Sequence, residues 1–278
     1  KACEDAMKDG LSVLGIDLLR TDFFITHLHL DHFGLLPRLA GETNRVYFGR
    51  KEVESIAAWP GWKTIARQAE IHGFPPGTLE TALGRSKGFA FETNANLNLV
   101  PMDPGQVLAV GDYQFQCVST PGHSAGHTCL WEAPKKVLIS GDHLLADISP
   151  SIHCWFAGQN PLKQYLESLD NVAAMPVETV LPGHRSVFYN PSSRIEELAF
   201  HHRNRCNEIL DILRKKPMTP FEAAAQISWA WGDGAWERLP ALQQWFATGE
   251  AIAHLQFLEE KQLVGRMDSG QIVRFYRL

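Results

Sequence analysis

A run of histidines and one aspartate follows a short apolar stretch near the start of the chain. Within the segment Thr26-His27-Leu28-His29-Leu30-Asp31-His32, four side chains carry imidazole or carboxylate groups, which bind metal ions. Alternate residues of an extended segment point to the same side, so His27 and His29 can share one ion. Asp31 and His32 come where the chain turns into a helical stretch, so they can serve a second ion nearby. This one motif could build two metal sites.

Three further candidates each follow an apolar, strand-like run and lie inside a turn that contains glycine. They are His123 in STPGHSAGH, Asp142 in LISGDH and His184 in VLPGH. One histidine at the end of a strand is most often structural, but seven such side chains in this order are difficult to explain by chance. Imidazole nitrogen and carboxylate oxygen suit zinc, and iron and manganese accept the same mixed set. The sequence therefore predicts two divalent metal ions, zinc first and iron or manganese as alternatives.

The other histidines carry weaker signals. His127 and His143 flank predicted ligands, and we expect them to hold those ligands in orientation rather than to bind metal. His153 lies close in sequence to the Asp142 turn and is the next candidate. Those without a motif are expected at ordinary surface or core positions: His72, His201, His202 and His254.

The elements that must position these groups alternate between strand and helix patterns. Strands are predicted at Asp22–Thr26, Val46–Phe48, Gln106–Val110, Tyr113–Thr120, Thr128–Ala133, Lys136–Ser140 and Thr179–Leu181. Helical patterns cover 33–42 and 162–174. A further helical stretch, 51–83, is broken at WPG and FPPG and is expected as an insert over the sheet, with Trp59 and Trp62 in its apolar core rather than in a substrate pocket.

From Arg194 onward the pattern becomes almost wholly helical. Helices are predicted at Ile195–Leu213, Pro220–Ile227 and Ala241–Leu263, followed by a two-stranded wing over Leu263–Leu278 that turns at Asp268-Ser269-Gly270. We therefore predict a catalytic domain over residues 1–193 and a small, mainly helical domain over 194–278 that resembles a winged-helix module.

The motifs THLHLDH, PGHSAGH, GDH and PGH resemble the metal-binding motifs of the metallo-β-lactamase superfamily, closest to its glyoxalase II-like and zinc-dependent hydrolase members. The resemblance covers roughly Asp22 to His184. It implies an α/β fold, an αββα sandwich with the metals at one edge between two sheets. It also implies ligand roles: His27, His29 and His123 at the first metal, Asp31, His32 and His184 at the second, and Asp142 bridging both.

One feature departs from this family. Its first sheet normally opens with strands upstream of the histidine motif, ending in an Asp-x-Gly turn. Here only a helix-like segment, Ala2 to Leu14, precedes the motif. Either the first strands lie upstream of Lys1 or another segment covers that edge of the sheet, and we expect the former.

A site with two metal ions and these ligands indicates a hydrolytic enzyme. Two cations about 3.5 to 4 Å apart lower the pKa of a shared water and polarise the scissile group. Asp142 would fix the metal spacing, and Asp31 could orient the attacking hydroxide by accepting a hydrogen bond, so these two are the catalytic candidates. The favoured substrate is a small ester, thioester or lactone. A metal-dependent endoribonuclease and an iron-dependent sulfur dioxygenase are the alternatives.

Charge and composition bear on partners and location. The formal net charge of −5 gives no electrostatic reason to bind nucleic acid or an anionic membrane. Residues 194–278 hold 11 Lys and Arg against 11 Asp and Glu, so the wing is expected to pack or to form a homodimer rather than to bind RNA. Phe275 and Tyr276 are expected in its core.

No run reaches the roughly 18 to 20 apolar residues of a membrane span, and the first ten residues are polar and acidic. We predict a cytoplasmic enzyme that acts on a small molecule.

Overall fold

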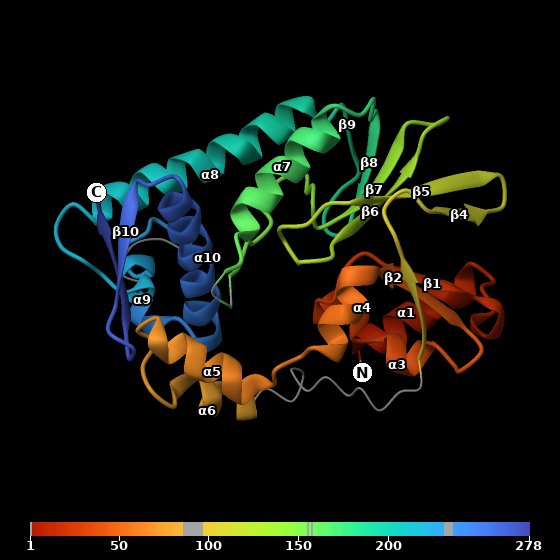
Figure 1. Ribbon diagram of the computed structural model, residues 1–278. Helices are drawn as coiled ribbons and strands as arrows, with labels where there is room; N and C mark the ends of the chain where they lie inside the picture. Colours follow the sequence, from red (N-terminus) through yellow and green to blue (C-terminus); the bar gives the residue numbers. More distant parts are fainter. Residues whose placement is uncertain (1, 86–96, 155, 157, 231–235) are drawn as a thin grey trace.

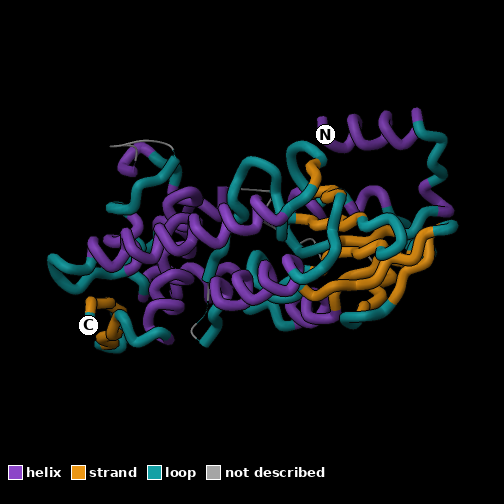
Figure 2. Tube along the Cα trace, turned by 90° about the horizontal axis from the view of Figure 1, so that it is seen from above, coloured by secondary structure: helices purple, strands orange, loops and turns teal. Residues whose placement is uncertain are grey.

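Most of the strands form two sheets that face each other, with helices on the outer sides (Figures 1 and 2). The computed structural model describes residues 2–85, 97–154, 156, 158–230 and 236–278. The first sheet is parallel, in the order β1-β2-β3, and contains β1 (Phe23–Ile25), β2 (Arg45–Gly49) and β3 (Asn98–Met102). The second sheet runs β4-β5-β6-β7-β8-β9 and contains β4 (Val107–Val110), β5 (Tyr113–Ser119), β6 (Thr128–Glu132), β7 (Val137–Gly141), β8 (Thr179–Pro182) and β9 (Phe188–Tyr189). The predicted αββα sandwich is confirmed.

Alternation along two strands shows why the layers stack in this way. In β2, Val46 and Phe48 belong to an apolar cluster on the helix side, whereas Tyr47 packs between the two sheets. In β6, Leu130 also packs between the sheets, whereas Trp131 points to the helices on the other side. Successive strand residues face opposite sides, so a strand that is apolar at every position must be covered on both faces.

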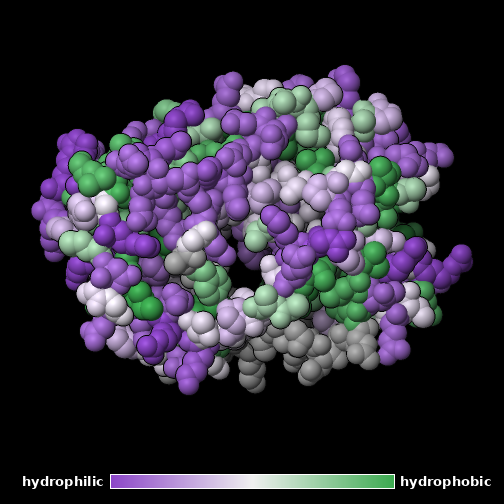
Figure 3. All heavy atoms as spheres, in the orientation of Figure 1, coloured by the Kyte–Doolittle hydropathy of each residue, from purple (hydrophilic) through white to green (hydrophobic). Residues whose placement is uncertain are grey.

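Long helices cover the outer face of the six-stranded sheet. α7 (Pro161–Ala173) begins at Asn160, whose side chain accepts a hydrogen bond from the Lys163 N–H. α8 (Ser192–Ile212) buries residues spaced three or four apart, namely Ile195, Leu198, His202, Arg205, Cys206 and Ile209. Figure 3 shows mainly hydrophilic side chains along the outer surface of α8. One apolar stripe therefore fixes α8 against the core.

The helical insert differs from the prediction in its packing partner. It consists of α4 (Arg50–Ala57), α5 (Trp62–Ile71) and α6 (Thr78–Arg85), with breaks at the two predicted proline-containing segments. Of these three helices, only α4 contacts the first sheet. α6 packs against α10 (Ala241–Glu260), and α5 shares an apolar cluster with α6 and with Trp245 of α10 (Figure 1). Trp62 lies with its ring centroid 6.4 Å from that of Trp245, and Trp59 is 38% exposed. The expectation of an insert over the sheet was wrong for α5 and α6 because their apolar face matches an aromatic surface on α10.

The C-terminal residues form the predicted helices and hairpin. α9 (Pro220–Ala224) and α10 precede the antiparallel pair β10 (Val264–Asp268) and β11 (Val273–Arg277). Phe275 is 1% exposed, as expected of a core residue, whereas Tyr276 is half-buried. One apolar cluster contains Leu138 of β7 together with Leu198 of α8 and Phe275, so this core crosses residue 193. The division into domains 1–193 and 194–278 and the likeness to a winged-helix module stay predictions.

Other elements differ from the sequence prediction in their bounds. The expected helix over 33–42 is two short helices, α2 (Leu30–Phe33) and α3 (Leu36–Leu39), since Pro37 favours a new helix start. The short strands β3 and β9 were not predicted. The chain begins with α1 (Ala2–Val13), which buries none of its residues, and 3-10 helices cover Leu18–Arg20 and Trp236–Arg238. Among the described residues, no helix is long and apolar enough to cross a membrane.

Replacing Phe275 with alanine should destabilise the fold by about 3 to 5 kcal/mol, because a buried aromatic ring is lost and a cavity is left. Backbone bonds between Phe275 and Met218, at 2.8 and 2.9 Å, tie the hairpin to the helical core. Denaturant unfolding of the variant and of Phe275→Leu, which keeps most of the volume, measures the effect. Equal midpoints for Phe275→Ala and the parent chain would contradict a core position.

Candidate metal centre

The predicted metal-binding residues lie at the same edge of the sandwich because their strands end there. His27 and His29 occupy the extended connection between β1 and α2, and Asp31 and His32 lie in α2. The others follow strands of the second sheet: His123 in the loop after β5, Asp142 directly after β7, and His184 after β8. β5 and β7 both pair antiparallel with β6, and β7 runs parallel to β8, so these three strands end at one edge.

Three histidines form a first group. His27 Nε2 lies 3.1 Å from His29 Nδ1 and 3.2 Å from His123 Nε2. His27 and His123 are buried, and His29 is half-buried. Burial lowers the pKa of all three imidazoles, so they are neutral and carry free lone pairs at neutral pH. Three neutral nitrogens that converge on one point can hold a metal ion.

A second group adjoins the first and is more open. His32 Nε2 lies 3.2 Å from His184 Nε2, and His184 Nε2 lies 3.2 Å from Asp31 Oδ2. The Asp31 side chain is 59% exposed, against 13% for His32. The second group therefore faces solvent on the side of Asp31, which is where a substrate could enter.

Asp142 lies between the two groups. Its Oδ2 is 3.5 Å from His123 Nε2 in the first group and 3.5 Å from His184 Nε2 in the second, while its Oδ1 is 3.4 Å from His32 Nε2. Burial raises the pKa of Asp142, but the surrounding histidines outweigh burial and lower it overall. An ionised carboxylate with contacts to both groups is suited to bridge two cations.

The distances test whether a metal fits. Ligand atoms about 2.1 Å from a tetrahedral ion are separated from one another by about 3.4 Å. Within the two groups, contacts between candidate ligand atoms run from 3.1 to 3.8 Å, which is close to this value. Two neutral imidazole nitrogens that face each other at 3.2 Å also leave lone pairs directed at the same point. Nitrogen and carboxylate ligands in this arrangement fit divalent metal ions.

The sequence model of the metallo-beta-lactamase superfamily matches residues 21–184, which is more than half of the chain. The chain belongs to the metallo-β-lactamase superfamily. Proteins of this superfamily bind divalent metals, and the match confirms the resemblance that the four motifs indicated.

Similarity to individual proteins also extends over most of the chain. A probable metallo-hydrolase, YqjP of Bacillus subtilis (strain 168), is 24% identical over 99% of this chain and 86% of its own length. The acyl-coenzyme A thioesterase MBLAC2 of Homo sapiens is 26% identical over 59% of this chain and 55% of its own length. The crystal structure of a metallo-beta-lactamase family protein from Thermus thermophilus superposes with a TM-score of 0.80 at 28% identity, covering 100% of this chain and 87% of that one.

Hydrogen bonds behind the candidate metal centre orient its residues. His123 Nδ1 donates to the Ser151 carbonyl at 2.8 Å, which leaves Nε2 free for the site. His127 Nε2 accepts from the Asp142 N–H at 3.1 Å, so its Nδ1 carries the proton and donates to the Thr120 hydroxyl at 2.7 Å. This geometry agrees with the supporting role expected of His127.

The other two neighbouring histidines have different surroundings. His143 is buried with its ring against Tyr165, at a centroid distance of 5.4 Å, and its carbonyl accepts a hydrogen bond from the Tyr165 hydroxyl. His153 stacks on Phe246 of α10 at 5.1 Å. His143 therefore supports the helix packed behind the site, and His153 joins the site region to the C-terminal helices.

The close approach of the β7 and β8 turns requires glycine at position 183. A Cβ there would lie 2.6 Å from Asp142 Oδ1 and 2.8 Å from the His32 ring. The glycine of the VLPGH turn thus lets His184 and Asp142 approach each other.

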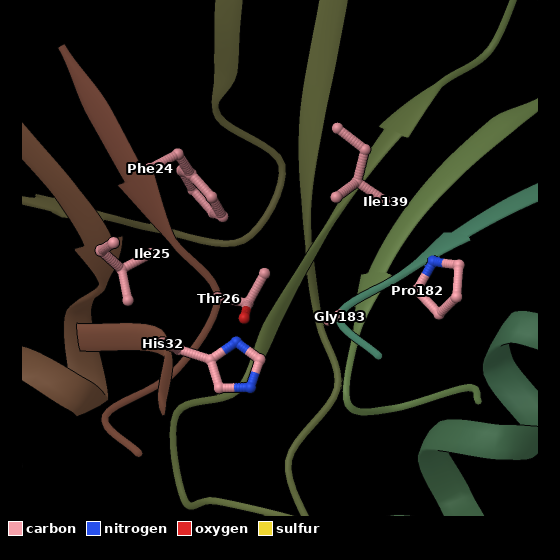
Figure 4. A pocket seen from close by; sticks show the side chains of 8 residues that line it. Phe24, Ile25, Thr26, His32, Ile139, Pro182 and Gly183 are labelled. Atoms are coloured by element: carbon pink, nitrogen blue, oxygen red, sulfur yellow. The ribbon is translucent and has the colours of Figure 1, made fainter. Parts of the chain in front are cut away.

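Next to Gly183, a cavity of about 140 Å³ opens between the sheets. His32 and Thr26 lie there beside apolar groups of Phe24, Ile139 and Pro182 (Figure 4).

Glu52 is buried beside the site and belongs to none of the four sequence motifs. Its carboxylate contacts the loops that follow β1 and β5. The signal was present: Glu52 shares the inward face of α4 with Val53 and Ile56, where an apolar residue is expected. A charged residue on the apolar face of a short helix marks a group with a specific partner.

Proposed function

We propose that this chain is a dinuclear metallo-hydrolase that cleaves a small thioester, with related esters and lactones as further substrates. The first ion is held by His27, His29 and His123, and the second by Asp31, His32 and His184. The proposal rests on the position of Asp142 Oδ2, which lies 3.5 Å from His123 Nε2 in the first group and 3.5 Å from His184 Nε2 in the second. We propose zinc as the metal, since the donor set suits it, with iron and manganese as alternatives.

We assign a different role in the reaction to each part of the site. Bound divalent cations supply positive charge, which lowers the pKa of water and stabilises the oxyanion that develops on the substrate. Asp142 holds the two groups at a fixed separation. Asp31, on the solvent side, accepts a hydrogen bond from the attacking water and directs its lone pair at the carbonyl carbon. The buried His27 and His123 keep bulk water from the inner side of the site.

One observation favours a thioester as substrate, and a second argues against a nuclease. The human relative is named as an acyl-coenzyme A thioesterase. The net charge of −5 and the equal numbers of basic and acidic residues in 194–278 provide no excess of basic charge of the kind that a nuclease uses to bind phosphates.

Metal analysis and a substrate screen test the proposal. Protein purified without chelator should contain about two equivalents of metal per chain and hydrolyse acyl-coenzyme A thioesters. Exhaustive chelation should abolish turnover, and zinc or manganese should restore it. Absence of metal from the purified chain, together with failure to bind added metal, would refute the site. Cleavage of RNA without thioester turnover would refute the substrate class.

A further inference from the structure

Glu52 is a buried carboxylate that joins the two loops carrying the histidines of the first group. It is the third residue of α4 and is 2% exposed. Its Oε1 accepts hydrogen bonds from the Ser124 hydroxyl and, at 2.8 Å, from the Gly126 N–H. The Leu28 N–H also donates to this carboxylate. One side chain therefore satisfies donors from two segments that are far apart in the sequence.

Each of these donors is a near neighbour of a predicted ligand. Leu28 lies between His27 and His29, and Ser124 directly follows His123. The three histidines must keep their nitrogens about 3 Å apart, although they belong to two loops on different sheets. A rigid link between the loops sets that separation before any ion arrives, and Glu52 makes such a link.

Close packing holds Glu52 in this position. A Cβ at Gly126 would lie 2.5 Å from the Glu52 backbone nitrogen, and a Cβ at Gly49 would lie 2.5 Å from the Gly126 carbonyl oxygen. The start of α4 is thus pressed against the loop after β5, with no room for a side chain on either backbone. The carboxylate cannot move away without moving the loop.

The chemistry of the contact requires an acceptor. The donors that hold Glu52 are neutral, and among the described residues Glu52 takes part in no ion pair with Lys, Arg or His. Burial of a carboxylate raises its pKa and costs free energy, and the hydrogen bonds offset part of this cost. A glutamine would turn an NH₂ group towards some of these N–H and O–H donors, so it can satisfy only part of the set.

We propose that Glu52 is a positioning residue that fixes His27 and His29 relative to His123. This inference rests on the proposed metal site and goes beyond it, since it assigns the preorganisation of the first group to a residue that binds no metal. Partners of this kind typically contribute about 10-fold to 100-fold in metal affinity. A residue that only stabilised the fold would change the unfolding free energy and leave the metal affinity of the folded chain unchanged.

The test measures metal affinity apart from activity. The metal-free parent chain and the Glu52→Ala, Glu52→Gln and Ser124→Ala variants are titrated with Co²⁺ and followed by visible absorption, under conditions where circular dichroism shows each to be folded. Glu54→Ala, two residues away on the exposed face of α4, is the matched control. We expect Glu54→Ala to bind like the parent and Glu52→Ala to bind about 10-fold to 100-fold more weakly with an altered spectrum. Glu52→Gln and Ser124→Ala should lie between them.

The outcomes separate the two proposals. Parent-like affinity and spectrum in Glu52→Ala would overturn the positioning role while leaving the metal site intact. If Glu52→Ala does not fold, parent-like binding by both Glu52→Gln and Ser124→Ala overturns it instead. A parent chain that binds no Co²⁺ would overturn the proposed metal site, and the positioning role with it.

Discussion

Replacing Asp142 with alanine is expected to lower the rate of the proposed thioester hydrolysis by about a thousandfold or more, because the side chain in contact with both groups of proposed ligands is lost. His32, His123 and His184 would then face one another without a negative charge between them. In the proposed dinuclear site the two cations would repel each other without a bridge, so bound metal should fall from about two equivalents towards one.

Elemental analysis and steady-state kinetics on the same preparations measure both effects. Asp147→Ala is the matched control, since Asp147 lies five residues further along the chain with a side chain that is 67% exposed. Asp142→Asn keeps the volume and loses the charge, so it separates packing from electrostatics. Two equivalents of metal and undiminished turnover in Asp142→Ala would exclude the bridging role.

Acid is expected to destabilise the metal-free protein strongly, owing to a buried histidine pair outside the site. His254 Nδ1 donates to the Glu250 carbonyl at 2.8 Å, so its Nε2 must accept from His202 Nδ1 at 3.2 Å. Both residues are at most 1% exposed, and burial lowers the pKa of His254 to about 3 and that of His202 well below its usual value. Protonation of His254 would place two donors face to face in the core.

The lowered pKa values determine the direction in which stability changes with pH. The unfolded chain takes up protons on these histidines near pH 6.5, whereas the folded chain does not. Their contribution to stability is therefore complete above about pH 6.5 and is lost as the pH falls from there towards about 3. Below this point each histidine should lower the free energy of unfolding by roughly 1 kcal/mol per pH unit.

Urea unfolding in the presence of chelator, at about pH 7.5, 6.5 and 5.5, measures this dependence. The double variant His202→Phe, His254→Leu removes both titrating groups and should show a shallower dependence on pH than the parent chain. A parent chain with the same unfolding free energy at all three pH values would rule the mechanism out. The effect is distinct from loss of metal, since the chelator removes metal at every pH.

Local patterns determined much of the structure. The strand ends, the glycine turns and the proline breaks are short-range features, so the sequence predicted most strands, the split of the insert and the C-terminal hairpin with small errors in the bounds. The same features put His27, Asp142 and His184 at strand ends, and strands of one sheet that run the same way end at one edge. The sequence thus predicted a set of seven residues that the structure does bring together.

Contacts between distant segments were decided only by the tertiary structure. Periodicity shows that a helix has an apolar face but not which surface will cover it, so α5 and α6 were assigned to the sheet although they pack on α10. The short strand β3 carries too few residues to form a pattern and is defined by its pairing with β2. Glu52 lies among apolar positions of its helix, but its partners could not be predicted because its three donors come from loops far away in the sequence. Hydrogen bonds and packing depend on distance in space, and that distance is set only when the whole chain has folded.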